Sequence, residues 1–527
     1  MWTPFAFDYT EYDIARADGP VFDYHFILSA QKLSNSHDFI TSSFDDYHLY
    51  HGAKLNVSSA NTGGIQIVFL GIGVDPAGVV ITSERLSDII KTQNTITKIC
   101  DYLSHCGGRY LFMASNGKTK RLYLDPVAMY SAVCNSGDKV IASIPTLAVP
   151  GPIESNLDYP FWENAAYPRG SRFAFGMTLD RRVQQLLPNH YLDLKTWKST
   201  RHWPNKNAVY ECTSQKEFDQ SIERIAHRHS QIIGALAEAF PVSIPVTGGQ
   251  DSRLLVAFAE PHKDKIKSFY THITNFNTQR DCDIAEKICQ EVNISHTVYR
   301  VRGNFAEYKP DLTLFQLRRR QLLRQGYLIE RGDLKLSKFT KIELAAHNAV
   351  PKDNVILRGH VTDISKAVLW RQIGLRRFRA NRDTPISSNI GLRLLQIRPN
   401  SDTELDFDRY SPLYENWMKS LSPNMNARSI DMMGIEQYRP YSLGNAFNGH
   451  AHNFYLSPGN DRQIIDDLLT FPAHMRADLH VNDALLRHSA PELEPIPFLR
   501  SGDNELRQTR AELDTYFDTP SAIAKVS

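Results

Sequence analysis

The sequence predicts an α/β protein of two domains. The chain has 527 residues, which is long enough for two large cores. Residues 1–205 contain mainly short apolar runs and turns, whereas the chain from residue 206 alternates helical and strand patterns and becomes mostly helical beyond residue 400. Helix–strand–helix–strand order favours a parallel sheet covered by helices. We therefore expect one domain over 1–205 and a second over 206–527, joined by the polar segment 198–207.

Composition restricts the classes of partner. The 60 basic and 58 acidic residues nearly balance, so no polyanionic partner is demanded and nucleic acid is not favoured. The first residues, MWTPFAFDYTEYD, lack the pattern of a signal peptide, and no apolar run is long enough to span a membrane. The six cysteines are scattered without a CxxC pair, which favours free thiols over zinc. We expect a cytoplasmic protein without a membrane partner.

Several elements have clear local signals. Apolar runs predict strands at 65–70, 109–113 and 120–124 in the first domain. In the second domain, Ser214 and Glu217 form a capping box. A long helix follows, because apolar residues recur at helical spacing at Phe218, Ile222, Ile225, Ile232 and Leu236. Strands at 242–246 and 266–271 and a helix at 284–291 come next.

Residues 244–253, IPVTGGQDSR, form the most informative stretch. Two adjacent glycines let the backbone approach a ligand closely, and the helix start that follows offers N–H groups to an anion. Thr247 and Ser252 add hydroxyl groups, and Asp251 is suited to hold a divalent cation on the same phosphates. No Gly-Lys-Ser/Thr follows, which excludes a Walker loop. A Gly-Gly turn without a ligand is the alternative, and the strand–turn–helix setting disfavours it.

This loop resembles the Ser-Gly-Gly-x-Asp-Ser pyrophosphate loop of ATP pyrophosphatases. With five further segments in order, the chain resembles the asparagine synthetase family, which includes β-lactam synthetase and the lasso-peptide cyclases. Those segments are 107–112 with 124–130, 187–193, 281–296, 358–364, and 457–462 through 471–472. Only the Gly-Gly loop is specific by itself, and the order of the others makes the case.

The resemblance implies an N-terminal Ntn-type glutaminase-like αββα sandwich. It implies a C-terminal doubly wound parallel-sheet ATP-pyrophosphatase domain (adenine nucleotide α-hydrolase-like) with added helices. ATP and Mg²⁺ are the implied cofactors, with Asp251 and Asp363 as the metal ligands. The implied nucleotide-binding residues are Val246, Thr247, Gly248, Gly249, Gln250, Asp251, Ser252, Thr271, Arg358 and Gly359.

The chain departs from the family at three positions. A glutaminase of this type needs an N-terminal cysteine as its nucleophile, and Trp2 follows Met1 here, so glutamine hydrolysis is not expected. His360 stands where asparagine synthetases have glutamate, and a histidine of ordinary pKa near 6.5 is suited to accept a proton from an attacking amine. A histidine that only fills space is equally compatible. The family's late lysine is missing, and Arg500 is the nearest cation.

The resemblance implies an ATP-dependent ligase that adenylates a carboxylate and couples it to an amine, releasing AMP and pyrophosphate. The substrates would be small molecules or a peptide, and a homodimer or a biosynthetic partner protein is compatible. The alternative is a nucleotide-binding relative that acts as a binding or assembly module. RNA modification is a weaker alternative. Basic clusters at 317–324 and 371–382 allow it, but a solvated helix face explains them better.

Overall fold

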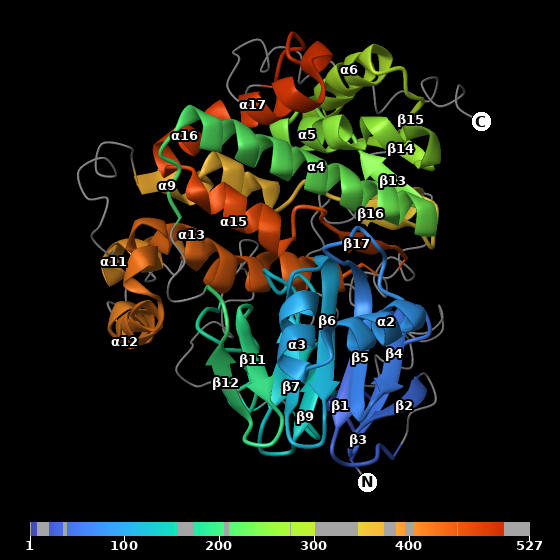
Figure 1. Ribbon diagram of the computed structural model, residues 1–527, viewed down its shortest axis with the longest axis vertical. Helices are drawn as coiled ribbons and strands as arrows, with labels where there is room; N and C mark the ends of the chain where they lie inside the picture. Colours follow the sequence, from blue (N-terminus) through green and yellow to red (C-terminus); the bar gives the residue numbers. More distant parts are fainter. Residues whose placement is uncertain are drawn as a thin grey trace.

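A computed structural model describes most of the chain. The described residues are 2–7, 21–34, 39–152, 154, 173–178, 180–204, 210–274, 276–300, 346–373, 386–395, 405–450 and 452–499. They form a mixed α/β structure with two antiparallel sheets in the N-terminal half and one parallel sheet in the C-terminal half (Figure 1). None of the helices in these ranges is both long enough and apolar enough to cross a membrane.

The two antiparallel sheets pack face to face. The first has the order β10 (Gln184–Gln185), β8 (Val133–Asn135), β9 (Val140–Ala142), β1 (Phe26–Ser29), β3 (Tyr47–His51) and β2 (Ile40–Phe44). The second has the order β12 (Lys198–Arg201), β11 (His190–Asp193), β7 (Lys120–Leu124), β6 (Gly107–Ser115), β5 (Ile65–Val74) and β4 (Val57–Thr62). Phe26 and Leu28 of β1 share one core with Leu70 of β5 and with Leu111 and Met113 of β6. Alternate residues of each strand therefore fill the space between the sheets.

Different kinds of helix pack on the outer faces of the two sheets. Helices α2 (Ser83–Gln93) and α3 (Ile96–Ser104) cover the second sheet, and Thr82 and Thr95 cap their N-termini. The short 3₁₀ helices η1 (Phe5–Phe7) and η2 (Pro145–Leu147) lie over the first sheet with Trp2 and Phe22. The predicted sandwich had α-helices in this fourth layer, and the described part of the chain places 3₁₀ turns there instead.

The parallel sheet has the order β15 (His296–Arg300), β14 (Ser268–Ile273), β13 (Val242–Pro245), β16 (Val355–Leu357) and β17 (Phe454–Leu456). All four neighbouring pairs are parallel. The strand order reverses between β13 and β16, because later strands are added outward on both sides. Ligands of open α/β sheets bind beyond the carboxyl ends of the strands at such a reversal. The loops that follow β13 and β16 are therefore the place to look for a site.

Helices surround this sheet. Helix α4 (Gln215–Ala239) begins where the capping box predicts, since the Ser214 side chain accepts a hydrogen bond from the Glu217 N–H. It crosses the front of the C-terminal half (Figure 1) and packs against α5 (Gln250–Ala259), α15 (Arg462–Thr470) and α17 (His480–Ser489). The other α-helices are α6 (Phe276–Glu291), α9 (Val368–Ile373), α11 (Ser388–Leu394), α12 (Leu405–Ser420), α13 (Ser429–Met433), α14 (Asn445–Asn448) and α16 (Ala473–Ala477). The remaining turns are the 3₁₀ helices η4 (Glu260–Lys265), η6 (Thr362–Lys366), η7 (Pro423–Arg428) and η10 (Pro491–Leu493), and the π-helices η8 (Gly434–Tyr438) and η9 (Pro440–Gly444).

The expected strands are present, with shifted ends at several positions. The strand at 120–124 is observed with the predicted bounds, and the strand predicted at 266–271 is observed as β14, Ser268–Ile273. The linker predicted at 198–207 is wrong in its first part. Residues Lys198–Arg201 form β12, which pairs with β11, because backbone pairing overrides the polar composition.

Buried polar side chains join the two halves. The Arg109 guanidinium is buried and donates to the backbone oxygen of Met129 at 3.1 Å and to Asn448 Oδ1 at 2.6 Å. Glu436 is also buried and accepts from Arg201 at 2.5 and 2.8 Å and from Asn189 at 3.0 Å. These contacts satisfy charges that water does not reach.

The loop 457–462 enters this interface between β17 and α15. Its Asn460 accepts from the Gly108 N–H at 3.0 Å and donates to Asp125 Oδ1 at 2.7 Å. Asp461 pairs with Arg228 of α4 at 2.9 Å. Arg462 donates to Asn189 Oδ1 and lies 4.5 Å from the centre of the Trp203 ring. One loop therefore contacts the second antiparallel sheet, helix α4 and the end of the N-terminal half.

Replacing Glu436 by alanine should lower the free energy of unfolding by about 3–5 kcal/mol, because the mostly buried Arg201 and the buried Asn189 and Trp417 would all lose the carboxylate to which they donate. The matched control is Glu415→Ala, an exposed glutamate on α12, which should change stability by less than about 0.5 kcal/mol. Urea unfolding measures both. Equal midpoints for the two variants would contradict the importance of the buried pair.

Candidate functional site

Hydroxyl side chains of the loop between β13 and α5 stabilise the loop by hydrogen bonds to its own backbone. The Ser252 hydroxyl accepts from the Thr247 N–H at 3.1 Å, and the Thr247 hydroxyl accepts from the Gly249 N–H at 3.2 Å. Gly249 is the N-cap of α5, and the first helical hydrogen bond is donated by the Arg253 N–H. The N–H groups of residues 250–252 precede that bond, and such groups at a helix start form an anion site.

Two later segments hold this loop in place. The Gly248 N–H donates to Asp281 Oδ1 of α6 at 2.9 Å, and the Gly248 oxygen accepts from the Leu499 N–H at 3.2 Å. A Cβ at Gly248 would lie 2.8 Å from Ile284 Cδ1, so a side chain there would have to displace Ile284. The Gly248 N–H is thus used to position the loop rather than being free for a ligand.

The segment before Leu499 is fastened to α5 by a buried arginine. Arg253 donates to the backbone oxygens of Leu493 and Ile496 and to that of Pro497 at 2.8 Å. Its guanidinium lies 3.9 Å from the centre of the Phe498 ring. Loop, helix α5 and the segment 493–499 therefore form one packed unit.

The loop after β16 lies directly against the first loop. A Cβ at Gly359 would lie 2.7 Å from the Asp251 backbone oxygen, so only glycine permits this approach. Val361 has a φ of 72°, which is strained for a β-branched residue. The next turn, η6, carries Asp363 and Lys366 towards the loop. The predicted residues of the two loops are thus brought together.

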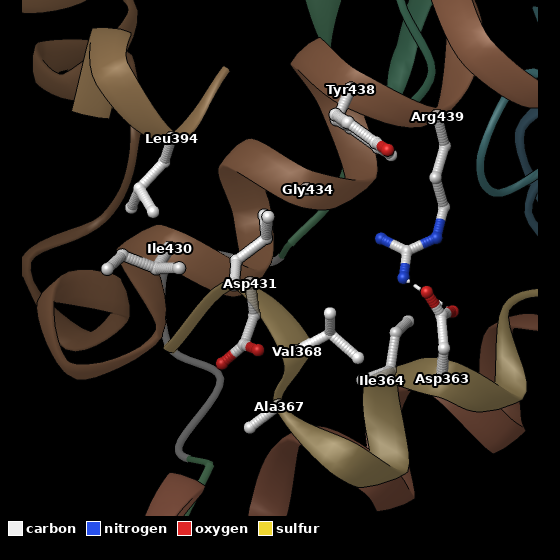
Figure 2. A pocket seen from close by; sticks show the side chains of 11 residues that line it. Asp363, Ile364, Ala367, Val368, Leu394, Ile430, Asp431, Gly434, Tyr438 and Arg439 are labelled. Carbon is white, nitrogen blue, oxygen red and sulfur yellow. Dashed lines mark hydrogen bonds and ion pairs between the residues drawn. The ribbon is translucent and has the colours of Figure 1, made fainter. Parts of the chain in front are cut away.

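Two carboxylates at this junction each face a cation. Lys366 Nζ lies 2.7 Å from Asp251 Oδ2, and Arg439 Nη2 lies 2.8 Å from Asp363 Oδ1 (Figure 2). Partial burial raises the pKa of Asp251, with Asp363 adding to the rise and Lys366 opposing it. Burial also opposes ionisation of Asp363, but Arg439 prevails and lowers its pKa. The negative charge of Asp363 thus acts on the ionisation of Asp251. Two carboxylates that bind one metal ion must lie close enough to influence each other in this way.

The residues fit a divalent cation on one further ground. Asp251 Oδ1 is buried and has no hydrogen-bond partner among the described residues. A buried carboxylate oxygen without a partner is costly, and a metal ion would satisfy it. The predicted assignment of Asp251 and Asp363 as Mg²⁺ ligands remains a prediction.

His360 differs from its predicted electrostatic state. Burial, followed by the charge of Arg358, lowers its pKa from 6.5 to about 4. Its backbone oxygen accepts a hydrogen bond from the Ser457 hydroxyl, and its ring packs edge-on against Phe447. The expected pKa near 6.5 is not met, because burial and the charge of Arg358 disfavour the protonated ring, and the role of His360 as a base remains a prediction.

Thr271 and Val246 support the loop from below. Thr271 is buried, and its hydroxyl donates to the Val246 backbone oxygen at 2.6 Å. Val246 itself is fully buried. Both were predicted to bind nucleotide, and in the structure the hydrogen bond between them holds the loop. Arg500, residues 317–324 and the side chains of residues 371–382 lie outside what the structure describes.

Sequence reasoning missed three residues of the site: Lys366, Asp281 and Arg439. Lys366 follows Asp363 by three residues and lies on the same 3₁₀ turn, so its spacing carried a usable signal. Asp281 and Arg439 reach the site from distant parts of the chain, and no local pattern marks them. Arg439 stands between the two π-helices η8 and η9, an irregular helix form frequent at functional sites.

A small pocket opens beside the Asp363–Arg439 pair (Figure 2). The helical turns of residues 363–369 form one wall, and residues 430–439 form the facing wall. Most of its lining is aliphatic, from Ile364, Val368, Leu394 and Ile430. Asp363 and Arg439 form a charged end, and the Asp431 carboxylate lies apart from them across the aliphatic part (Figure 2).

The low pKa of His360 is testable by pH titration in NMR, with His360→Gln to assign its resonance. We expect its pKa to be about 4, against 6.5 for a solvated ring. Between these values the unfolded chain binds a proton that the folded protein does not, so His360 should contribute a loss of stability as the pH falls from 6.5 to 4. A measured pKa near 6.5 would contradict the burial.

Comparisons with known proteins add little to this geometry. No protein-family model matches the chain, and no curated protein matches it. Among solved structures, the U34-tRNA thiolase NcsA from Methanococcus maripaludis with its iron–sulfur (4Fe-4S) cluster is similar at 14% identity, over 42% of this chain and 84% of that chain, with a TM-score of 0.18. A likeness of this size carries no argument about this chain.

Proposed function

We propose that this protein is an ATP-dependent, AMP-forming synthetase of the asparagine synthetase type. It would adenylate a substrate carboxylate and couple it to an amine without hydrolysing glutamine. One observation carries the proposal. Two carboxylate–cation pairs, Asp251–Lys366 and Asp363–Arg439, stand where the strand order of the parallel sheet reverses, beside the Thr-Gly-Gly-Gln-Asp-Ser loop.

The nucleotide would bind through the loop after β13. The N–H groups of residues 250–252 would face the β- and γ-phosphates, and Lys366 would place its positive charge on the same oxygens. Asp251 and Asp363 would hold Mg²⁺, which would neutralise charge on the departing pyrophosphate. Lys366 and Arg439 would be released from their carboxylates in exchange.

The cleaved bond follows from this placement. With the β- and γ-phosphates bound by the loop, the carboxylate would attack the α-phosphorus and pyrophosphate would leave. The final nucleotide product would therefore be AMP rather than ADP. Lys366 would stabilise the negative charge that develops during this step. It would thereby supply a positive charge for which the sequence offered only Arg500.

The substrate carboxylate would enter beside Arg439. The pocket in Figure 2 has an aliphatic lining and a charged end at Asp363 and Arg439, so it suits a carboxylate that carries an aliphatic group. His360, neutral at pH 7, would accept the proton of the attacking amine.

The N-terminal half would not supply ammonia. Trp2 is buried and its backbone pairs with Leu33, so its side chain offers core packing rather than a nucleophile. The six cysteines are free, and burial raises the pKa of Cys100 and Cys134 to about 12. Thiols in this state are poor nucleophiles.

A second candidate is a nucleotide-binding relative without catalysis. Its support is the same pair of ion contacts, because Asp251 and Asp363 already have cationic partners and need no metal to be neutralised. Melting with nucleotide tests what both candidates share, and pyrophosphate exchange separates them, since only the first candidate requires turnover.

Mg-ATP should raise the melting temperature, because a ligand that binds only the folded state stabilises it. Gly249→Val and Asp251→Ala should abolish the rise, since they alter the loop and its carboxylate. Asp264→Ala, an exposed aspartate on η4, is the control and should retain it. Unchanged melting of the parent protein at millimolar nucleotide would remove the basis of both candidates.

Exchange of labelled pyrophosphate into ATP should depend on a carboxylate substrate from an aliphatic panel. Lys366→Met should slow this exchange by about 10²–10³-fold, the usual cost of removing a preorganised stabilising group. Lys352→Met is the control, since Lys352 is exposed. Nucleotide-dependent stabilisation without exchange for any carboxylate would favour the non-catalytic candidate, and ADP as the product would exclude the proposed chemistry.

A further inference from the structure

Three side chains with metal-ligating atoms meet beneath the nucleotide loop. Cys282 and Glu286 are four residues apart on α6, and His296 begins β15. Their ligand atoms all lie within 4.8 Å of one another. The Cys282 thiol points at Glu286 Oε1, with 3.8 Å between sulfur and oxygen. Spacing i and i+4 places both side chains on one face of the helix.

The hydrogen bonds of Thr271 define which nitrogen of His296 is free. The Thr271 hydroxyl has one proton, which it donates to the Val246 oxygen at 2.6 Å. His296 Nε2 lies 2.8 Å from the same hydroxyl, so Nε2 must carry the proton and donate. His296 Nδ1 then has an available lone pair, and it is buried without a hydrogen-bond partner among the described residues. Histidines that bind a metal through one ring nitrogen usually donate a hydrogen bond from the other nitrogen, as His296 does here.

We propose that Cys282, Glu286 and His296 form a binding site for Zn²⁺. Thiolate and imidazole ligands favour zinc over Mg²⁺ or Ca²⁺, and three protein ligands leave a fourth position for water. Ligands of a tetrahedral zinc at 2.0–2.3 Å lie about 3.3–3.8 Å apart. The sulfur–oxygen distance of 3.8 Å already meets this range, and the other separations, all within 4.8 Å, need a contraction of at most about 1–1.5 Å.

The site connects to the nucleotide loop by two short paths. Asp281, next to Cys282, accepts the Gly248 N–H, and Thr271 links His296 to the Val246 oxygen. Zinc would join α6 to β15 and thereby fix both supports of the loop. The proposal does not rest on ATP use. Cysteine spacing alone predicted no zinc. The proposed ligands come together only in the fold, because Cys282 and Glu286 lie on α6 and His296 lies on β15.

Cobalt binding to the full-length, chelator-treated protein tests the site. Co²⁺ should give an intense near-ultraviolet thiolate-to-cobalt band, and added Zn²⁺ should abolish it by displacement. Cys282→Ser should lack the band. Cys289→Ser, a buried cysteine on the same helix, is the matched control and should keep it. Glu286→Gln and His296→Ala should weaken Co²⁺ binding at least about tenfold.

Circular dichroism checks that each variant is folded. Glu286 is exposed, so Glu286→Gln decides the question if Cys282→Ser fails to fold. Absence of the band from the parent protein would overturn the proposal. It would also be overturned by a band that persists in Cys282→Ser, by a band lost in Cys289→Ser, or by unchanged affinity in Glu286→Gln.

Discussion

The loop 457–462 is the constraint on which the rest of the molecule depends. Asn460 and Asp461 contact the second antiparallel sheet and α4, while the Ser457 hydroxyl holds the His360 backbone oxygen. Gly459 lies against η6, since a Cβ there would be 3.0 Å from Thr362 Oγ1. The same short loop therefore joins the two halves and sets the position of the second site loop. Because its Asp461–Arg228 pair is buried, losing either partner would leave an uncompensated charge.

Charge balance explains the state of the site. Asp251 and Asp363 would repel each other without cations, and Lys366 and Arg439 remove that repulsion. A ligand that brings both negative phosphates and a positive ion can replace these internal partners one for one. A site with balanced internal pairs thus stays folded when empty and exchanges its contacts on binding.

The sequence predicted what local patterns encode. The capping box located the start of α4, the apolar run gave β7 its bounds, and the Gly-Gly loop lies between a strand and a helix, β13 and α5, as predicted. It could not predict contacts that depend on tertiary packing, such as Arg439 beside Asp363. The pKa of His360 was mispredicted for the same reason, because burial and Arg358 determine it and neither is a local property of the pattern.

The packing of Arg253 has a consequence for synthesis of the chain. Its buried guanidinium is satisfied by backbone oxygens of Leu493, Ile496 and Pro497, more than 200 residues later. A chain emerging from the ribosome folds its early parts first, and it must hold this charge without those oxygens until residues 493–497 are made. The Gly-Gly loop would therefore reach its final form only after that segment has emerged. A nascent chain would finish its antiparallel sheets long before it gained a competent loop.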